Sequence, residues 1–148
     1  MFLDGSSAFD KVWHAGLIAK LEQVGVDGTC LDMITCYLAD RKQVVVVDGQ
    51  VSDVVDVKAG VPQGSKLGPL LFILYMNDIT EEIESDILLF ADDTSLFAAG
   101  SDPAETAAQL NRDLERIYNW SVKWKVKFNS NKSKDIIFSL ERYCNYNR

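Results

Sequence analysis

A chain of 148 residues, of which 47% are hydrophobic and 25% charged, is long enough for one domain with a buried core and too short for two comfortable ones. The net charge of -7 argues against strong nucleic-acid binding by this chain alone, because phosphates are neutralised by lysine and arginine. The longest apolar run, 70–76, is far shorter than the roughly 20 residues that span a bilayer, and the start lacks the features of a signal peptide, so we expect an intracellular protein with no membrane segment.

The first predicted elements are a short strand and two helices. Residues 2–4 form an apolar segment that ends in the carboxylate of Asp4. Apolar residues recur at helical spacing over 10–24, and Gly25 is placed to end that helix. A second helix is predicted over 29–38.

The middle of the chain is predicted to form a hairpin, a loop and a helix. Two β-rich runs, 41–47 and 51–57, are joined by Asp-Gly-Gln at 48–50, and Asp-Gly is a strong hairpin signal. The segment 60–65, Gly-Val-Pro-Gln-Gly-Ser, precedes an apolar, largely buried helix over 67–79. Glycines at this spacing let a backbone approach a ligand closely, although an ordinary loop before a core helix is the alternative.

A second hairpin is predicted to carry acid at its tip. The strand-like run 87–90 leads into Asp92 and Asp93, and a second strand is predicted over 94–98. Adjacent carboxylates beside apolar strands repel each other and lose hydration, and a bound cation such as Mg²⁺ compensates for both effects. A solvated acidic turn is the alternative. If the strand that ends at Asp4 neighbours this hairpin, three carboxylates converge at one edge of the sheet.

The last third of the chain is predicted to contain a long helix and two short strands. Asp102 is placed as an N-cap for an amphipathic helix that runs to about Trp124. Short strands are predicted over 126–129 and 135–140, and 141–148 is predicted to be a frayed tail. The whole order of elements predicts an α+β domain, with helices packed on one face of a mainly antiparallel sheet.

Four groups of residues together resemble a known family. In order and spacing they are similar to the motifs lettered A to D of reverse transcriptases, particularly those of non-LTR, LINE-type, jockey-like retrotransposons: 2–4 with 8–10, 60–69, 90–94, and Trp124 with 128–129 and Lys132. The resemblance implies a reverse-transcriptase palm over 1–140 that lacks the fingers and the thumb. It also implies an RNA-directed DNA polymerase, which transfers a nucleotide from a dNTP to a primer 3′-hydroxyl.

The resemblance implies a role for each acidic residue. Asp4 and Asp92 would hold two Mg²⁺ ions, which Mn²⁺ could replace, and Asp93 would complete the acidic triad. The carbonyl of Gly5 would help to hold the metal ion that accompanies the nucleotide. Lys132 would donate a proton to pyrophosphate or contact a phosphate, and a solvated loop lysine is the alternative.

The resemblance also implies substrate contacts and partners. Phe9 would block a ribose 2′-hydroxyl and so select dNTPs, while Gln63 and Gly64 would lie against the incoming nucleotide and the template. The partners would be an RNA template and a DNA primer, with the parent element acting in nucleus and cytoplasm. We expect no primer extension by this chain alone, because the positioning surfaces of fingers and thumb are missing. The alternatives are a catalytically inert truncated remnant or an acidic α+β module for metal binding or interaction.

Overall fold

The structure is a computed structural model that describes residues 1–4 and 8–138. Its helical elements are η1 (Ala8–Lys11), α1 (His14–Gln23), α2 (Gly28–Leu38), α3 (Leu67–Met76), η2 (Asn77–Thr80) and α4 (Pro103–Trp124), where η marks a 3₁₀ helix. Its strands are β1 (Phe2–Asp4), β2 (Lys42–Gln43), β3 (Val46–Val47), β4 (Gln50–Val51), β5 (Val55–Asp56), β6 (Asp86–Phe90) and β7 (Asp93–Phe97). All strand pairs among the described residues are antiparallel, and the predicted α+β class is confirmed.

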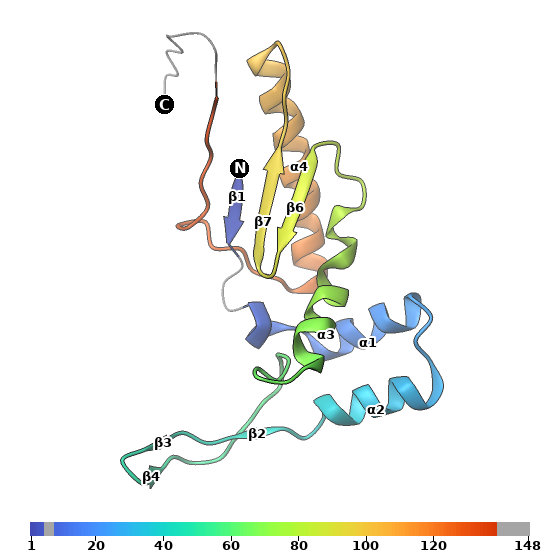
Figure 1. Ribbon diagram of the computed structural model, residues 1–148, viewed down its shortest axis with the longest axis vertical. Coiled ribbons are helices and arrows are strands. Elements are labelled where there is room, and N and C mark those ends of the chain that lie inside the picture. The colour runs from blue at the N-terminus through green and yellow to red at the C-terminus, as the bar shows by residue number, and fades with distance from the viewer. Residues whose placement is uncertain (5–7, 139–148) are drawn as a thin grey trace.

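The main sheet has three strands in the order β1-β7-β6, and α4 runs behind it (Figure 1). Side chains alternate between the two faces of a strand. Leu3, Thr94 and Leu96 are buried on one face, whereas Asp93 and Phe97 are exposed on the other. The sheet therefore has a covered back, which packs into the core, and an open front.

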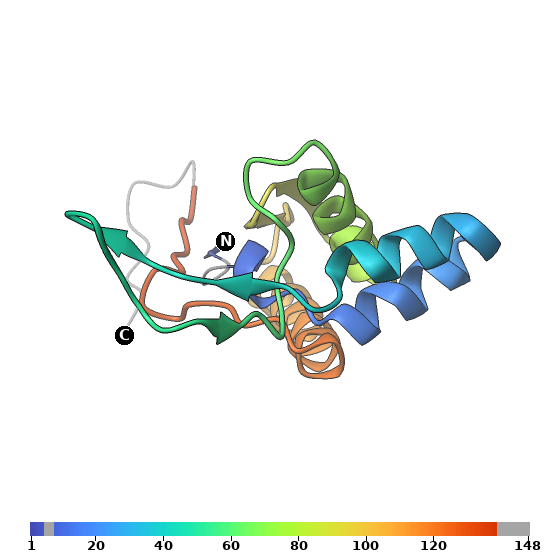
Figure 2. The ribbon, with the colours of Figure 1, turned by 90° about the horizontal axis from the view of Figure 1, so that it is seen from below.

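The helices α1 and α3 pack together at one end of the sheet, and α2 packs beside α1 (Figures 1 and 2). Their buried side chains join those of α4 in one core. These core side chains include Leu17, Leu21, Leu38, Leu71, Phe72, Tyr75, Ile117 and Trp124. None of the helices in the described ranges is long and apolar enough to cross a membrane.

The predicted hairpin in the middle of the chain forms a thin arm that leaves the body of the molecule (Figure 2). Its two short ladders pair β2 with β5 and β3 with β4. At the tip, Asp48 and Gly49 have φ angles of 49° and 77°, as an Asp-Gly hairpin turn requires. Seven valines of the arm are between 44% and 64% exposed: Val44, Val45, Val46, Val47, Val51, Val54 and Val55.

Two features of the helices differ from the sequence prediction. The helix predicted over 10–24 begins only at His14, because the backbone just before it pairs elsewhere. The carbonyls of Phe9 and Val12 each accept a hydrogen bond from the loop that precedes α3, both at 2.9 Å. The predicted core helix ends as α3 at Met76 and continues as η2, and its Leu70 and Ile73 side chains are exposed.

The strands predicted over 126–129 and 135–140 are wrong within the described residues. After α4 the chain forms backbone hydrogen bonds with β1 and does not form the two predicted strands. Phe2 and Lys134 exchange backbone hydrogen bonds of 2.7 and 3.0 Å, and the Asn129 N–H donates to the Asp4 carbonyl at 2.8 Å. Residues 139–148, which include the predicted tail 141–148, lie outside the described residues.

Candidate metal and nucleotide site

Two of the predicted acidic residues, Asp4 and Asp93, lie directly opposite each other on neighbouring strands. Asp4 ends β1, and Asp93 opens β7 directly opposite it. Side chains of directly opposed residues in an antiparallel pair project from the same face, with Cβ atoms about 4.5–5.5 Å apart. The first strand and the acidic hairpin are therefore neighbours in the sheet, and Figure 1 shows the end of β1 beside the turn between β6 and β7.

The turn of this hairpin consists of Ala91 and Asp92, since Phe90 and Asp93 pair across it. Ala91 has a φ of 52°, a left-handed conformation that costs a non-glycine residue about 1 kcal/mol or more. The Asp92 side chain is half-buried and makes no hydrogen bond or ion pair with a described residue.

Within the described part of the chain, no three His, Cys, Asp or Glu side chains gather closely enough to hold one ion. A site made by Asp4, Asp92 and Asp93 together therefore stays a prediction.

The carboxylate of Asp4 is only partly neutralised. Its Oδ1 atom is buried and accepts no hydrogen bond from the described residues. The Lys132 ammonium lies 3.4 Å from Oδ1 and 3.5 Å from Oδ2. A charge-assisted hydrogen bond is normally about 2.7–2.9 Å long, so this is a loose ion pair. A buried carboxylate oxygen without a donor is costly, and a bound cation would remove that cost.

A hollow of about 350 Å³ opens beside these groups. Its lining residues come from both ends of the chain and from the acidic hairpin: Phe2, Leu3, Asp4, Phe90, Asp93, Thr94, Ser95 and Lys132. The carboxylates of Asp4 and Asp93 in this lining are oxygen ligands of the type that hard divalent ions prefer. The unsatisfied oxygen, the facing carboxylate and the hollow all fit a divalent ion next to Asp4.

The turn after α4 places Lys132 at this hollow. The Lys132 N–H donates to the Asn129 carbonyl at 3.1 Å and closes the turn. The Asn129 N–H is itself bonded to the Asp4 carbonyl, so the turn is fixed to the last residue of β1. Backbone contacts thus bring Lys132 to an acid that lies 128 positions earlier in the chain.

The glycine-rich loop is bound to the segment that follows β1. Gly60 has a φ of 89°, and a Cβ atom on it would lie 2.7 Å from the Asp10 carbonyl oxygen, so a larger residue would not fit. The Gln63 amide donates a hydrogen bond of 2.6 Å to the Asp10 carboxylate. Sequence reasoning missed this role of Asp10, because no local pattern links two residues that lie 53 positions apart.

The predicted nucleotide contacts gather near this loop and not in the hollow. The ring of Phe9 stacks on Phe72, with centroids 4.2 Å apart and planes at 22°. Gln63 is exposed, and Gly64 lies in open space with a φ of 78°. None of these residues lines the hollow. The predicted contact through Gly5 falls outside the described residues.

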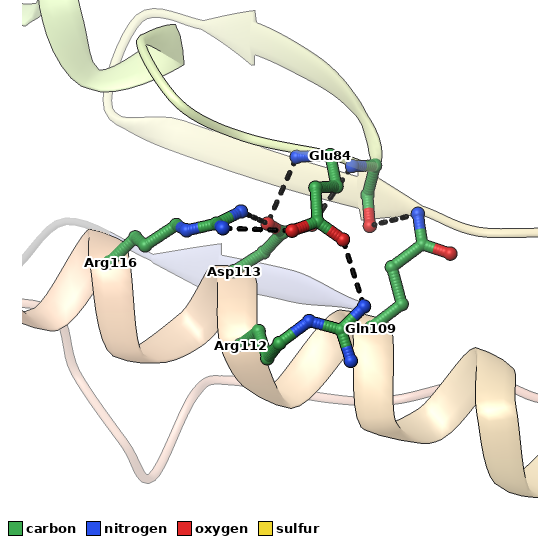
Figure 3. A network of polar contacts seen from close by, with 6 residues as sticks. Glu84, Gln109, Arg112, Asp113 and Arg116 are labelled. Atoms are coloured by element: carbon green, nitrogen blue, oxygen red, sulfur yellow. Dashed lines mark hydrogen bonds and ion pairs between the residues drawn. The ribbon is translucent and has the colours of Figure 1, made fainter.

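Behind the sheet, Asp113 of α4 holds the segment that enters β6 (Figure 3). Its side chain is 0% exposed and accepts hydrogen bonds from the N–H groups of Glu84 at 3.0 Å and Ser85 at 2.8 Å. Burial alone would raise the pKa of Asp113, but these bonds and the Arg116 guanidinium at 3.0 Å outweigh it and leave the pKa below its usual value.

The carboxylate of Glu84 extends this network on the surface (Figure 3). It forms ion pairs of 2.8 Å with Arg112 and with Arg116, which together hold the pKa of Glu84 below its usual range. Sequence reasoning missed the network. Its one signal was Asp113, a charged residue placed among the inward-facing apolar positions of α4.

A second polar cluster that was not predicted lies in the core around Lys20. The Lys20 ammonium forms an ion pair with Asp78 and donates to the Tyr75 carbonyl at 2.6 Å. It also lies 4.0 Å from the centroid of the Trp124 ring and 4.7 Å from that of Trp120. Burial lowers the pKa of Lys20 against the opposing effect of Asp78, and burial raises the pKa of Tyr75 to about 12. The cluster ties α1, α3 and α4 together.

Comparison with known proteins matches nearly the whole chain to one family. A profile described as reverse transcriptase (RNA-dependent DNA polymerase) matches residues 1–142. The RNA-directed DNA polymerase from mobile element jockey of Drosophila melanogaster is 34% identical over 146 residues, which cover 93% of this chain and 16% of that protein. The probable RNA-directed DNA polymerase from transposon X-element of the same organism is 34% identical over 147 residues, or 96% of this chain and 16% of that protein.

A more distant relative belongs to another element. The retrovirus-related Pol polyprotein from type-1 retrotransposable element R2 of Popillia japonica is 27% identical over 84 residues, which cover 57% of this chain and 14% of that protein. The chain thus spans about 16% of the length of the first two curated relatives.

Proposed function

The chain belongs to the reverse transcriptase (RNA-dependent DNA polymerase) family, and from this premise we propose that it is the metal-binding palm of a retrotransposon polymerase. The proposed reaction joins a dNTP to a primer 3′-hydroxyl on an RNA template. The observation that carries the proposal is the pair of facing acids, Asp4 and Asp93, beside a hollow in which an Asp4 oxygen has no hydrogen-bond donor.

The acids would act as ligands for two divalent ions. Bound ions of this kind activate the attacking hydroxyl and stabilise the leaving pyrophosphate. Asp4 would supply the oxygen that lacks a donor, Asp93 would face it from β7, and Asp92 would contribute from the turn. The strained φ of Ala91 supports this role, because backbone strain tends to be retained where a turn must aim functional side chains.

Phe9, Gln63 and Gly64 would contact the nucleotide and the template. Stacking on Phe72 fixes the ring of Phe9. A fixed ring suits the proposed role, because a side chain excludes a 2′-hydroxyl only if it is held in position. The hydrogen bond to Asp10 holds the Gln63 amide, and the open surroundings of Gly64 leave its backbone accessible to a ligand. Gly5 would contribute its carbonyl oxygen.

The RNA template and the DNA primer would be held largely by other parts of the polymerase. A net charge of -7 disfavours contact with many phosphates, so ions at the acids and local cations such as Lys132 would make the phosphate contacts here. Lys132 would contact a phosphate oxygen of the nucleotide or donate a proton to pyrophosphate.

Calorimetric titration with Mn²⁺ tests the proposal on the purified chain. The Asp4→Asn variant should lose at least about tenfold in affinity, since it removes one charged ligand. Asp86→Asn is a matched control, because Asp86 is an exposed acid at the other end of the same hairpin and its loss changes the net charge equally. Equal affinities of the wild type and Asp4→Asn would overturn the proposed metal site.

A further inference from the structure

We propose that Lys132 competes with the metal for Asp4: its ammonium partly neutralises the carboxylate in the metal-free chain and is released when Asp4 binds a divalent ion. This inference rests on the proposed function. It starts from the position of one atom, the Lys132 Nζ, which lies almost equally far from both oxygens of the Asp4 carboxylate, at 3.4 and 3.5 Å. A cation centred on a carboxylate in this way occupies the direction from which a metal ion would bind.

The pair is built loosely enough to exchange. The Lys132 side chain is 64% exposed, and exposed ion pairs contribute little because water and salt screen them. Its distances exceed those of a good charge-assisted hydrogen bond, and the Asp4 Oδ1 atom remains without a hydrogen-bond donor. A divalent ion, with twice the charge and a shorter ligand distance, would therefore displace the ammonium.

Release of the side chain does not require the turn to open. The backbone around Lys132 is held by the bond from the Asn129 N–H to the Asp4 carbonyl and by the paired bonds between Phe2 and Lys134. None of these bonds involves the lysine side chain. The exchange is therefore a local movement of one side chain about a fixed backbone.

The exchange would couple metal binding to phosphate binding. Lys132 lines the same hollow as Asp4 and Asp93, so its released side chain would remain within reach of phosphate oxygens bound there. While it is paired with Asp4 it offers less charge to a phosphate. Because coupling between two ligands is reciprocal, metal binding would strengthen phosphate binding, and phosphate would strengthen metal binding.

Mn²⁺ calorimetry on the full chain tests the competition directly. Lys132→Gln should bind Mn²⁺ about two- to fivefold more tightly than the wild type, as expected from loss of an exposed ion pair. Lys134→Gln is the matched control: it removes the same charge two positions along the segment, from an exposed side chain with no ion pair to a described residue. Lys132→Arg should restore the wild-type affinity because it keeps the cation.

Two comparisons separate failure of this inference from failure of the proposed function. If Asp4→Asn loses Mn²⁺ binding while Lys132→Gln and Lys134→Gln bind equally, the metal site stands and the competition is wrong. If Asp4→Asn binds like the wild type, the proposed site itself is wrong, and the inference falls with it.

A spectroscopic readout follows the ammonium itself. In a chain labelled with ¹⁵N at the lysine side chains, Mg²⁺ should shift the Lys132 signal, which is assigned by its absence in Lys132→Gln. The Lys134 signal should not move. An unshifted Lys132 signal at saturating Mg²⁺ would contradict release of the side chain.

Discussion

The covered back and the open front of the three-stranded sheet differ in how many hydrogen bonds they give to a carboxylate. Behind the sheet, Asp113 is fully buried, and both of its oxygens accept hydrogen bonds from backbone N–H groups. In front, Asp4 is more accessible, yet its Oδ1 atom has no donor among the described residues and its cation is loosely held. The contrast separates two uses of an acid: a satisfied carboxylate holds the fold, and an unsatisfied one leaves a position for a ligand.

The largest expected effect on the free energy of unfolding comes from Asp113, the carboxylate whose oxygens are both hydrogen-bonded. Asp113→Ala should lower the free energy of unfolding by about 3 kcal/mol, because it leaves the N–H groups of Glu84 and Ser85 without acceptors in a buried place. Urea denaturation followed by circular dichroism measures the loss. Asp113→Asn, which keeps the shape and one acceptor, should lose less. A loss of under about 1 kcal/mol in the alanine variant would mean that the network does not hold the hairpin.

An intermediate effect should appear when the pH is lowered. The folded-state pKa of Asp113 lies below its usual value of about 3.8, so its stabilisation is present above that value and is lost as the pH falls toward the folded-state pKa. The difference in unfolding free energy between wild type and Asp113→Asn should therefore be full near neutral pH and shrink in acid. Urea titrations at a series of pH values test this. A difference that stays constant from about pH 7 to about pH 3 would contradict the assignment.

The smallest expected effect on the free energy of unfolding comes from Asp4, the carboxylate with an oxygen that lacks a donor. Without metal, Asp4→Asn should change the free energy of unfolding by no more than about 0.5 kcal/mol, because the exposed pair with Lys132 is weak and the repulsion from Asp93 is relieved. The measurement is the same urea denaturation, with Asp86→Asn as the reference for a changed net charge. If Asp4→Asn proved as destabilising as Asp113→Ala, the distinction between the two carboxylates would be lost.

Elements whose signals are local were predictable from the sequence. The helix α4 begins and ends where it was expected, since Asp102 caps it by accepting from the Ala104 N–H at 2.8 Å and Lys125 closes it with a left-handed φ of 56°. The arm also has its Asp-Gly turn in place at 48–49. In each case the determining contacts lie within a few residues of one another.

Elements that depend on distant partners were not predictable in this way. The segment 126–138 has strand-like composition, but it pairs with β1 at isolated points, which no local pattern shows. The partners of Lys20 and Asp113 are likewise set by tertiary packing. Of the predicted acids, the register places Asp93 opposite Asp4 and leaves Asp92 in the turn, a choice that depends on how two separate strands align.

The pairing of β1 with β7 has a consequence for the order of assembly. It joins residues 2–4 to residues 93–95, whereas the β6–β7 hairpin closes across a turn of two residues. Contacts between sequence-distant segments form late, because closing a long loop costs chain entropy before any contact compensates for it. On the ribosome, β1 would emerge long before β7 and would stay unpaired until β7 is synthesised. The facing acids would thus be among the last features of the domain to form, and a nascent chain that has not yet reached β7 would carry neither the acid pair nor its hollow.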